Sequence, residues 1–125
     1  MTVERLHVSK RFSEIAIAGN LVHLAGQLAT DVELDIKGQT QQTLDIIDQF
    51  LTDAGTDKSH IMSVTIYLKD IEKDYAAFNE VWDAWVADIE ALPRTCVEAK
   101  LYDPRVLVEL LSLIHISEPT RQEAI

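Results

Sequence analysis

Arg94 and Glu109 are the residues whose types and surroundings could support chemistry. Arg94 lies in the segment Pro93–Ala99, which reads Pro-Arg-Thr-Cys-Val-Glu-Ala. Its planar guanidinium could hold a carboxylate through parallel charge-assisted hydrogen bonds, each worth roughly 1.5–3 kcal/mol when desolvated. The segment therefore predicts an anion-binding arginine at the start of a strand. Spacing alone leaves a solvated arginine at a sheet edge as the alternative.

Glu109 is a carboxylate inside the apolar segment Val106–Leu111. Burying a charge costs several kcal/mol unless the charge is compensated, so such a carboxylate is rarely there for packing. One interpretation is a group that handles protons in a pocket. The other is a charge that protects an edge strand from aggregation, and both interpretations stay open.

Strand alternation predicts which side chains share a face with Arg94. The expected core face holds Val97, Ala99 and Leu101, and the other face holds Arg94, Cys96 and Glu98. If strand Val106–Leu110 pairs with strand Thr95–Leu101 across a loop with an even number of residues, Glu109 shares the face of Arg94. An odd number places Glu109 on the opposite face. A shared face would line one pocket with a cation and a carboxylate.

Other kinds of site find no support in the sequence. The histidines show no metal-ligand spacing; they are His7, His23, His60 and His115. No glycine-rich phosphate loop and no nucleophile elbow is present, so neither a metal nor a nucleotide site is predicted. Cys96 is the only cysteine, which excludes an internal disulfide. No histidine is placed to activate Cys96 as a nucleophile.

The composition is that of one globular domain. The chain has 125 residues, of which 47% are hydrophobic and 26% charged. Its formal net charge of −10 disfavours nucleic acid and anionic membrane surfaces as partners. The first residues form no apolar signal-peptide region, and no run approaches the ~20 apolar residues of a spanning helix. We expect a cytoplasmic protein.

The hydrophobic patterns predict the order β-β-α-β-α-β-β. The expected strands are Ile15–Ala18, Leu21–Ala25, Ile61–Leu68, Thr95–Leu101 and Val106–Leu110, and the expected helices are Gln39–Ala54 and about Tyr75–Ile89. Gly19-Asn20 suits a tight hairpin turn, and Gly55 suits a helix C-cap. Helices packed on one face of a mixed sheet would bury the apolar sides of these helices and strands.

Several segments together resemble the RidA family of reactive-intermediate deaminases. They are the hairpin Gly19–Gln27 with its final Gly-Gln, the helix start Gly38–Leu44 with Ala54-Gly55 closing the helix, Phe78–Trp82, Pro93–Ala99 and Val108–Leu110. Each motif alone is weak. Their combination, in the right order from about Ser13 to Leu110, makes the resemblance specific.

The resemblance implies a chorismate-mutase-like α+β fold, with two helices on one face of a mixed sheet. It implies a homotrimer with active sites in the clefts between subunits. It also implies hydrolysis of reactive 2-enamino and 2-imino acids to 2-oxo acids and ammonia. No metal or cofactor is expected for this reaction, because the carbon of a protonated imine is already electrophilic.

The resemblance also implies roles for individual residues. Arg94 would clamp the substrate carboxylate, assisted by the backbone N–H of Cys96. Glu109 would orient or activate the attacking water as a general acid and base. Asn79 and Gly26 would shape the pocket.

The sequence departs from the best-characterised branch of this family. Phe12 stands where that branch has the tyrosine of a Gly-Pro-Tyr-Ser-Gln motif, so an aromatic wall remains without its phenol. Ala25 stands where a serine often precedes Gly-Gln, and Trp82–Trp85 resembles a divergent branch. These differences keep a second hypothesis open, a non-catalytic carboxylate-binding or regulatory module on the same fold.

The end of the chain has a different character. Residues 111–121 resemble a translated adapter from DNA library preparation, so we expect a domain over residues 1–110 and a non-native tail over 111–125. Leu111–Ile116 still alternates well enough to extend the last strand. Ser117 onward is expected to be loosely attached, and His115 is not expected to be catalytic.

Overall fold

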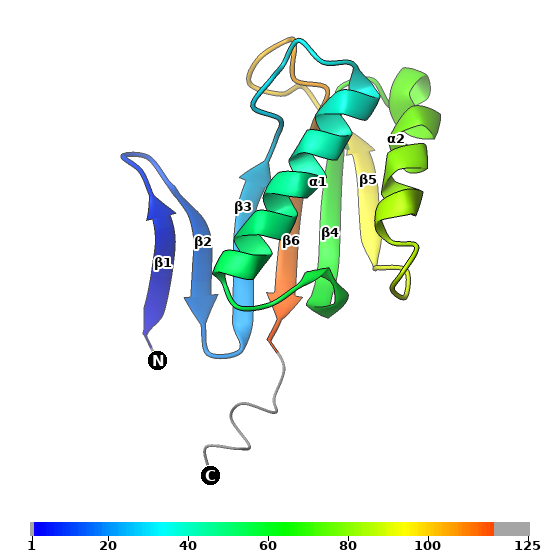
Figure 1. Cartoon of the computed structure of the whole chain (residues 1–125). Helices are drawn as coiled ribbons and strands as arrows, with labels where there is room; N and C mark the ends of the chain where they lie inside the picture. The colour runs from blue at the N-terminus through cyan, green and yellow to red at the C-terminus, as the bar shows by residue number, and fades with distance from the viewer. Residues whose placement is uncertain (1, 117–125) are drawn as a thin grey trace.

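A computed structural model describes residues 2–116 and shows a mixed sheet with two α-helices on one face (Figure 1). The strands are β1 (Val3–Val8), β2 (Ser13–Ala18), β3 (Leu21–Gln27), β4 (Ile61–Leu68), β5 (Arg94–Glu98) and β6 (Val108–His115). The helices are α1 (Ile36–Asp53) and α2 (Ile71–Trp85), with a 3-10 turn at Lys58–His60. The α+β class and the placement of both helices on one face are confirmed.

The six strands lie in the order β1-β2-β3-β6-β4-β5. All neighbours are antiparallel except β4 and β5, which are parallel. β6 therefore lies in the middle of the sheet, and β5 forms one edge. The pairing of the last two strands, considered above as a condition, does not occur, because β4 lies between them.

The structure adds one strand and moves both helix starts. β1 was missed because its side chains are mostly exposed and half of them are polar or charged, as suits an edge strand. Helix α1 begins before the predicted Gln39, since Asp35 caps it by accepting a hydrogen bond from the N–H of Gly38. Asp70 caps α2 in the same way through the N–H of Lys73, so α2 begins before Tyr75 and ends at Trp85.

The core lies between the helices and the sheet. The helices contribute fully buried Leu44, Leu51 and Phe78, and the strands contribute Leu24, Ile66 and Leu110, among others. Burying one such side chain contributes about 1.5–3 kcal/mol. The opposite face of the sheet carries no helix (Figure 1). No described helix is long and apolar enough to cross a membrane.

Residues 111–115 belong to β6. This part of the strand pairs with both β3 and β4, and the His115 ring lies 2.7 Å from the side-chain nitrogen of Asn20. The predicted foreign origin of residues 111–125 stays a prediction, because any residues with the right alternation would complete the strand. The predicted loose attachment from Ser117 onward lies outside the described residues.

Ser112 tests how the core tolerates a polar group. Its side chain is 3% exposed, and its hydroxyl has no hydrogen-bond partner among residues 2–116. A buried hydroxyl without a partner costs about 1–3 kcal/mol. We therefore expect Ser112→Ala to raise the free energy of unfolding by about 1 kcal/mol, measured by urea denaturation.

The matched control is Ser63→Ala at an exposed position of β4, where the change should stay within about 0.5 kcal/mol. A Ser112→Ala protein less stable than its parent would contradict the prediction.

Candidate functional site

The guanidinium of Arg94 is fixed by side chains of α2. One terminal nitrogen, Nη2, donates to Oδ1 of Asn79 at 2.8 Å and to the hydroxyl of Tyr75 at 3.2 Å. The guanidinium carbon lies 5.3 Å from the ring centroid of Trp82 and 5.8 Å from those of Tyr75 and Phe78. Cation–π contacts of this kind contribute about 0.5–2 kcal/mol each. Arg94 is therefore held in one orientation.

Arg94 has no acidic partner within the described chain. No ion pair of Arg94 is found among residues 2–116, although the chain has 21 acidic residues against 11 basic ones. Its second terminal nitrogen, Nη1, is buried without a hydrogen-bond partner in that part of the chain. A buried N–H without a partner is rare and calls for an explanation. The positive charge of Arg94 therefore has no counter-charge in that part of the chain.

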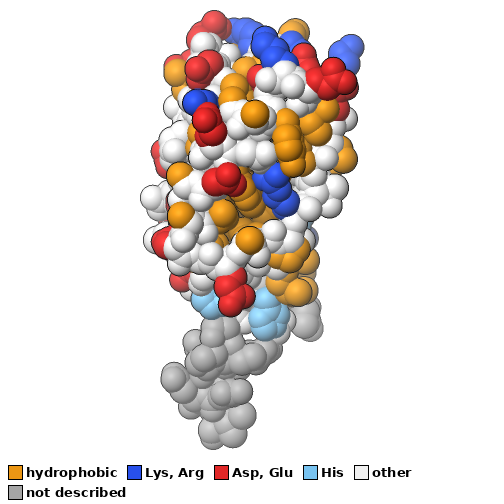
Figure 2. All heavy atoms as spheres, turned by 90° about the vertical axis from the view of Figure 1, so that its right-hand side faces the viewer, with side chains coloured by type: hydrophobic (Ala, Val, Ile, Leu, Met, Phe, Trp, Pro, Cys, Tyr) orange, Lys and Arg blue, Asp and Glu red, His pale blue; other side chains and the backbone are white. Residues whose placement is uncertain are grey.

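A cavity of about 550 Å³ opens beside Arg94, between α2 and the edge strand β5. Its lining consists of Ile71, Glu72, Tyr75, Arg94 and Cys96. Figure 2, which views this side of the molecule, shows hydrophobic side chains gathered around a basic one, with acidic side chains scattered around them. The cavity can hold a small molecule that carries one negative charge.

The backbone of Cys96 faces the free edge of β5. In a parallel pair, alternate residues of an edge strand direct their N–H and C=O groups to the neighbour. The carbonyl of Pro93 accepts from Val64, and the N–H of Ala99 donates to the carbonyl of Leu68, both on β4. Cys96 has the opposite parity, so its N–H points away from β4. This N–H and the Arg94 side chain could contact the same ligand.

The thiol of Cys96 is not suited to act as a nucleophile. Burial raises its pKa above the ordinary value, and the charge of Arg94 offsets only part of that increase. Because the thiolate is the reactive form, a raised pKa lowers reactivity at neutral pH.

The predicted core face of β5 is wrong. Val97 is 39% exposed, whereas Cys96 packs against the core. Arg94 and Cys96 face the helices, because the aromatic rings of α2 accommodate the guanidinium, and Val97 faces the side of the sheet without helices. The strand also ends at Glu98, so Ala99 and Leu101 lie beyond it.

Glu109 lies on the face of the sheet opposite to Arg94. Tyr67 of β4 pairs with both Val97 and Glu109, and cross-strand partners point to the same side. Ile66, the preceding residue of β4, pairs with Cys96. The structure therefore realises the alternative in which the two charged groups do not share a face.

Glu109 and Gly26 are in direct contact. A methyl group at Gly26 would lie 2.2 Å from Oε2 of Glu109, so only glycine leaves room for this carboxylate. Glu109 is half-buried, and it makes no ion pair or hydrogen bond with another described residue that would compensate its charge. Burial raises the pKa of Glu109 above its usual range, so this pKa lies closer to neutral pH than that of an exposed glutamate.

Phe12 and Gly26 line a second, larger cavity. It measures about 900 Å³ and extends from the turn between β1 and β2 to α1. Phe12 is 55% exposed at its rim. The predicted site residues thus form two groups in one chain. Arg94, Asn79 and Cys96 lie beside α2, whereas Glu109 contacts Gly26, which lines the second cavity together with Phe12.

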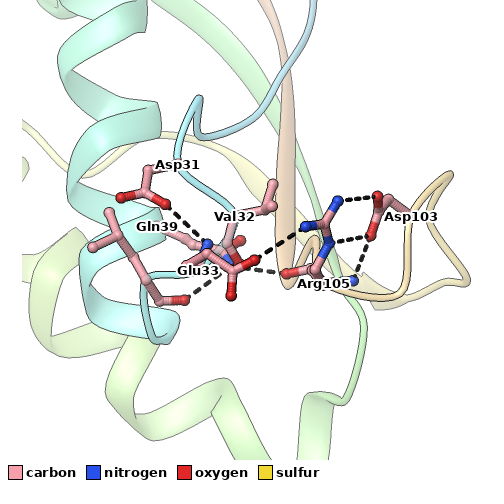
Figure 3. A network of polar contacts seen from close by, with 7 residues as sticks. Asp31, Val32, Glu33, Gln39, Asp103 and Arg105 are labelled. Atoms are coloured by element: carbon pink, nitrogen blue, oxygen red, sulfur yellow. Dashed lines mark hydrogen bonds and ion pairs between the residues drawn. The ribbon is translucent and has the colours of Figure 1, made fainter.

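A buried glutamine holds the start of β6, and with it Glu109. Oε1 of Gln39 accepts from the N–H of Leu107 at 2.9 Å. Its Nε2 donates to the carbonyl of Arg105 at 2.9 Å (Figure 3). Arg105 in turn holds Asp103 through hydrogen bonds of 3.1 and 2.9 Å and lowers the pKa of Asp103 to about 2. It also reaches Glu33 at 3.0 Å.

The sequence did not reveal every residue of the site. Glu72 was not singled out, since a charge in the first turn of a helix has no distinctive pattern. Tyr75 and Trp82 were taken only as parts of a hydrophobic stripe, and their spacing does carry the signal that they share a face with Asn79. Among the described residues, no group of three or more His, Cys, Asp and Glu side chains could hold a metal ion.

Known proteins resemble the chain along most of its length. A family model described as endoribonuclease L-PSP matches residues 2–116. A RutC family protein of Haemophilus ducreyi is 43% identical over 109 residues, which cover 87% of this chain and 92% of that protein. The structure of an uncharacterised protein from Pseudomonas aeruginosa is 40% identical, with a TM-score of 0.88 over 93% of this chain and 100% of the other.

A further solved structure is that of YyfA from Yersinia pestis, described as a protein of unknown function of the conserved Rid protein family. It is 25% identical, with a TM-score of 0.81, and the match covers 87% of this chain and 90% of that chain.

The contact between Gly26 and Glu109 can be tested through stability. Gly26→Ala should destabilise the fold by about 1 kcal/mol or more, because the new methyl group must displace the carboxylate. In a Glu109→Ala background the same change should cost nearly nothing, since the displaced side chain is absent.

Urea denaturation of the four proteins gives the coupling energy, which should be at least about 0.5 kcal/mol. Additive effects of the two substitutions would show that the two residues do not meet.

Proposed function

The chain belongs to the RidA family, the family whose model is described as endoribonuclease L-PSP, and we propose that it hydrolyses reactive 2-enamino and 2-imino acids to 2-oxo acids and ammonia. The observation that carries the proposal is the fixed guanidinium of Arg94. It is oriented by Asn79, Tyr75 and aromatic rings, borders a cavity, and has no carboxylate partner among residues 2–116. A substrate carboxylate completes this arrangement.

The chemistry requires little beyond binding and proton transfer. An enamine first becomes its imine tautomer, and a protonated imine has an electrophilic carbon. Glu109 accepts a proton from water as the water oxygen bonds to that carbon. Glu109 then returns this proton to the nitrogen and takes the proton of the new hydroxyl as the carbon–oxygen double bond forms. The carbon–nitrogen bond breaks with its electron pair on nitrogen, and ammonia leaves the 2-oxo acid. The raised pKa of Glu109 suits a group that takes and returns a proton near neutral pH.

The active site is formed between two copies of the chain. Arg94 and Glu109 lie on opposite faces of one sheet, so they contact the same substrate only if Glu109 comes from a neighbouring copy. In this proposal one copy supplies Arg94, Asn79 and the N–H of Cys96. The next copy supplies Glu109, beside Gly26 and the aromatic wall of Phe12.

The face of the sheet without helices supports assembly into a homotrimer. It bears Val97, which is 39% exposed, and Leu21, which is 40% exposed, together with half-buried Leu111 and Leu113. Contiguous apolar side chains on an open sheet face mark a protein–protein interface. A closed ring of three copies would cover this face in every copy and repeat the composite site at each interface.

RNA is a poor ligand for this site despite the name of the family model. The net charge of −10 repels a phosphate backbone, and the cavity beside Arg94 offers a single basic side chain. We therefore propose a small carboxylate as the substrate. We keep the cytoplasm as the predicted location.

Removing the guanidinium tests the proposed reaction. We expect Arg94→Ala to lower kcat/KM for ammonia release from enzymatically generated 2-imino acids by about a hundredfold or more, because two charge-assisted hydrogen bonds are lost. Arg94→Lys should also be impaired, since an ammonium cannot form the planar pair of bonds. Arg5→Ala, which removes an exposed charge from β1, serves as the control.

A parent protein that releases ammonia no faster than Arg94→Ala would refute the proposed deaminase activity. The alternative, a binding module without turnover, then predicts that a 2-oxo acid raises the melting temperature of the parent and of Glu109→Gln alike.

A further inference from the structure

The cavity beside Arg94 carries opposite charges at its two ends. Glu72, Tyr75 and Asn79 are spaced by three and four residues on α2, so they form one row along the same face of the helix. Asn79 and Tyr75 hold the guanidinium, and Glu72 lies beyond Tyr75 while still lining the cavity. At 1.5 Å per residue, the levels of Asn79 and Glu72 are about 10 Å apart along the helix.

Glu72 is available to a ligand. It is exposed and makes no ion pair or hydrogen bond with the other described residues. Glu80, also on α2, differs because it pairs with Lys37 of α1. The first turn of α2 is also tied to β5, because Oε1 of Glu98 accepts from the N–H of Ile71 at 3.1 Å. This bond keeps the end of α2 that carries Glu72 close to the strand that carries Arg94.

We propose that Glu72 gives this site a preference for 2-imino acids with a cationic side chain, such as the imine of arginine. This inference rests on the proposed function and names its substrate class. The substrate carboxylate meets Arg94, and a side chain of arginine length runs past Tyr75 toward Glu72. Ile71 and Cys96 offer apolar contacts to its methylene groups. A substrate with a second carboxylate would meet the like charge of Glu72.

A structural role for Glu72 makes different predictions. An acidic residue in the first turn stabilises a helix by about 0.3–1 kcal/mol through the helix dipole. Loss of that effect would lower the melting temperature and leave the ratio of rates for two substrates unchanged. The ratio therefore separates substrate selection from helix stability.

The test compares kcat/KM for the 2-imino acids of arginine, leucine and glutamate in the intact protein. The parent should prefer the arginine-derived substrate and turn over the glutamate-derived one least. Glu72→Gln should lower the arginine-to-leucine ratio by about two- to fivefold, the effect of one exposed charge pair. Glu72→Lys should lower it further and improve the glutamate-derived substrate. The preference should weaken as salt is added.

Asp83→Asn is the matched control, because it removes one negative charge from an exposed position of the same helix. It should leave both the ratio and the rate on the leucine-derived substrate unchanged. An unchanged ratio in Glu72→Gln and Glu72→Lys would overturn the inference while the turnover of imines still supports the enzyme.

A parent protein without activity on any imine would refute the proposed function. The preference for a cationic side chain would then be tested by ligand binding. The corresponding 2-oxo acids serve as probes in thermal shift. The 2-oxo acid that corresponds to arginine should then raise the melting temperature of the parent more than 4-methyl-2-oxopentanoate, which corresponds to leucine. Glu72→Gln should abolish this difference. Equal shifts in the parent would overturn the inference.

Discussion

The alternation of side chains across the sheet determines what the proposed site can be. Along β4, Ile66 pairs with Cys96 and Leu110, whereas Tyr67 pairs with Val97 and Glu109. Successive side chains of a strand point to opposite faces, and no choice of rotamer carries a carboxylate through a hydrogen-bonded sheet. Arg94 and Glu109 therefore serve one substrate only across an interface between copies.

The environment of Arg94 supports the proposal that this arginine binds a carboxylate and is not simply a solvated surface charge. Asn79 and the aromatic rings of Tyr75, Phe78 and Trp82 orient the guanidinium without neutralising it. A carboxylate bound there meets a preorganised cation close to apolar surface, where electrostatic attraction is stronger than in water. The carboxylate of Glu109 has no compensating charge among residues 2–116, and burial raises its pKa.

Several features were predictable from the sequence because they depend on local chemistry. Periodicity gave the two helices and most strands, and charge type singled out Arg94 and Glu109. The faces of β5 were assigned the wrong way round because strand alternation alone placed Val97, Ala99 and Leu101 on the core side. The contacts of Arg94 with side chains of α2 explain why the core side can accommodate it. The order of the strands in the sheet could not be predicted from local patterns either, since β4 lies between β5 and β6 and pairs with strands that are distant in the sequence. Gln39 escaped notice for a similar reason: its partners, Arg105 and Leu107, are far along the chain.

Subunit complementation tests the central claim most directly. Arg94→Ala and Glu109→Gln are each expected to be inactive, but a random equimolar assembly of the two chains leaves about one quarter of the interfaces with both residues intact. The two variants would be unfolded and reassembled together, and ammonia release from 2-imino acids would be measured. We predict about one quarter of the parent activity. A mixture no more active than either variant alone would contradict an active site shared between copies.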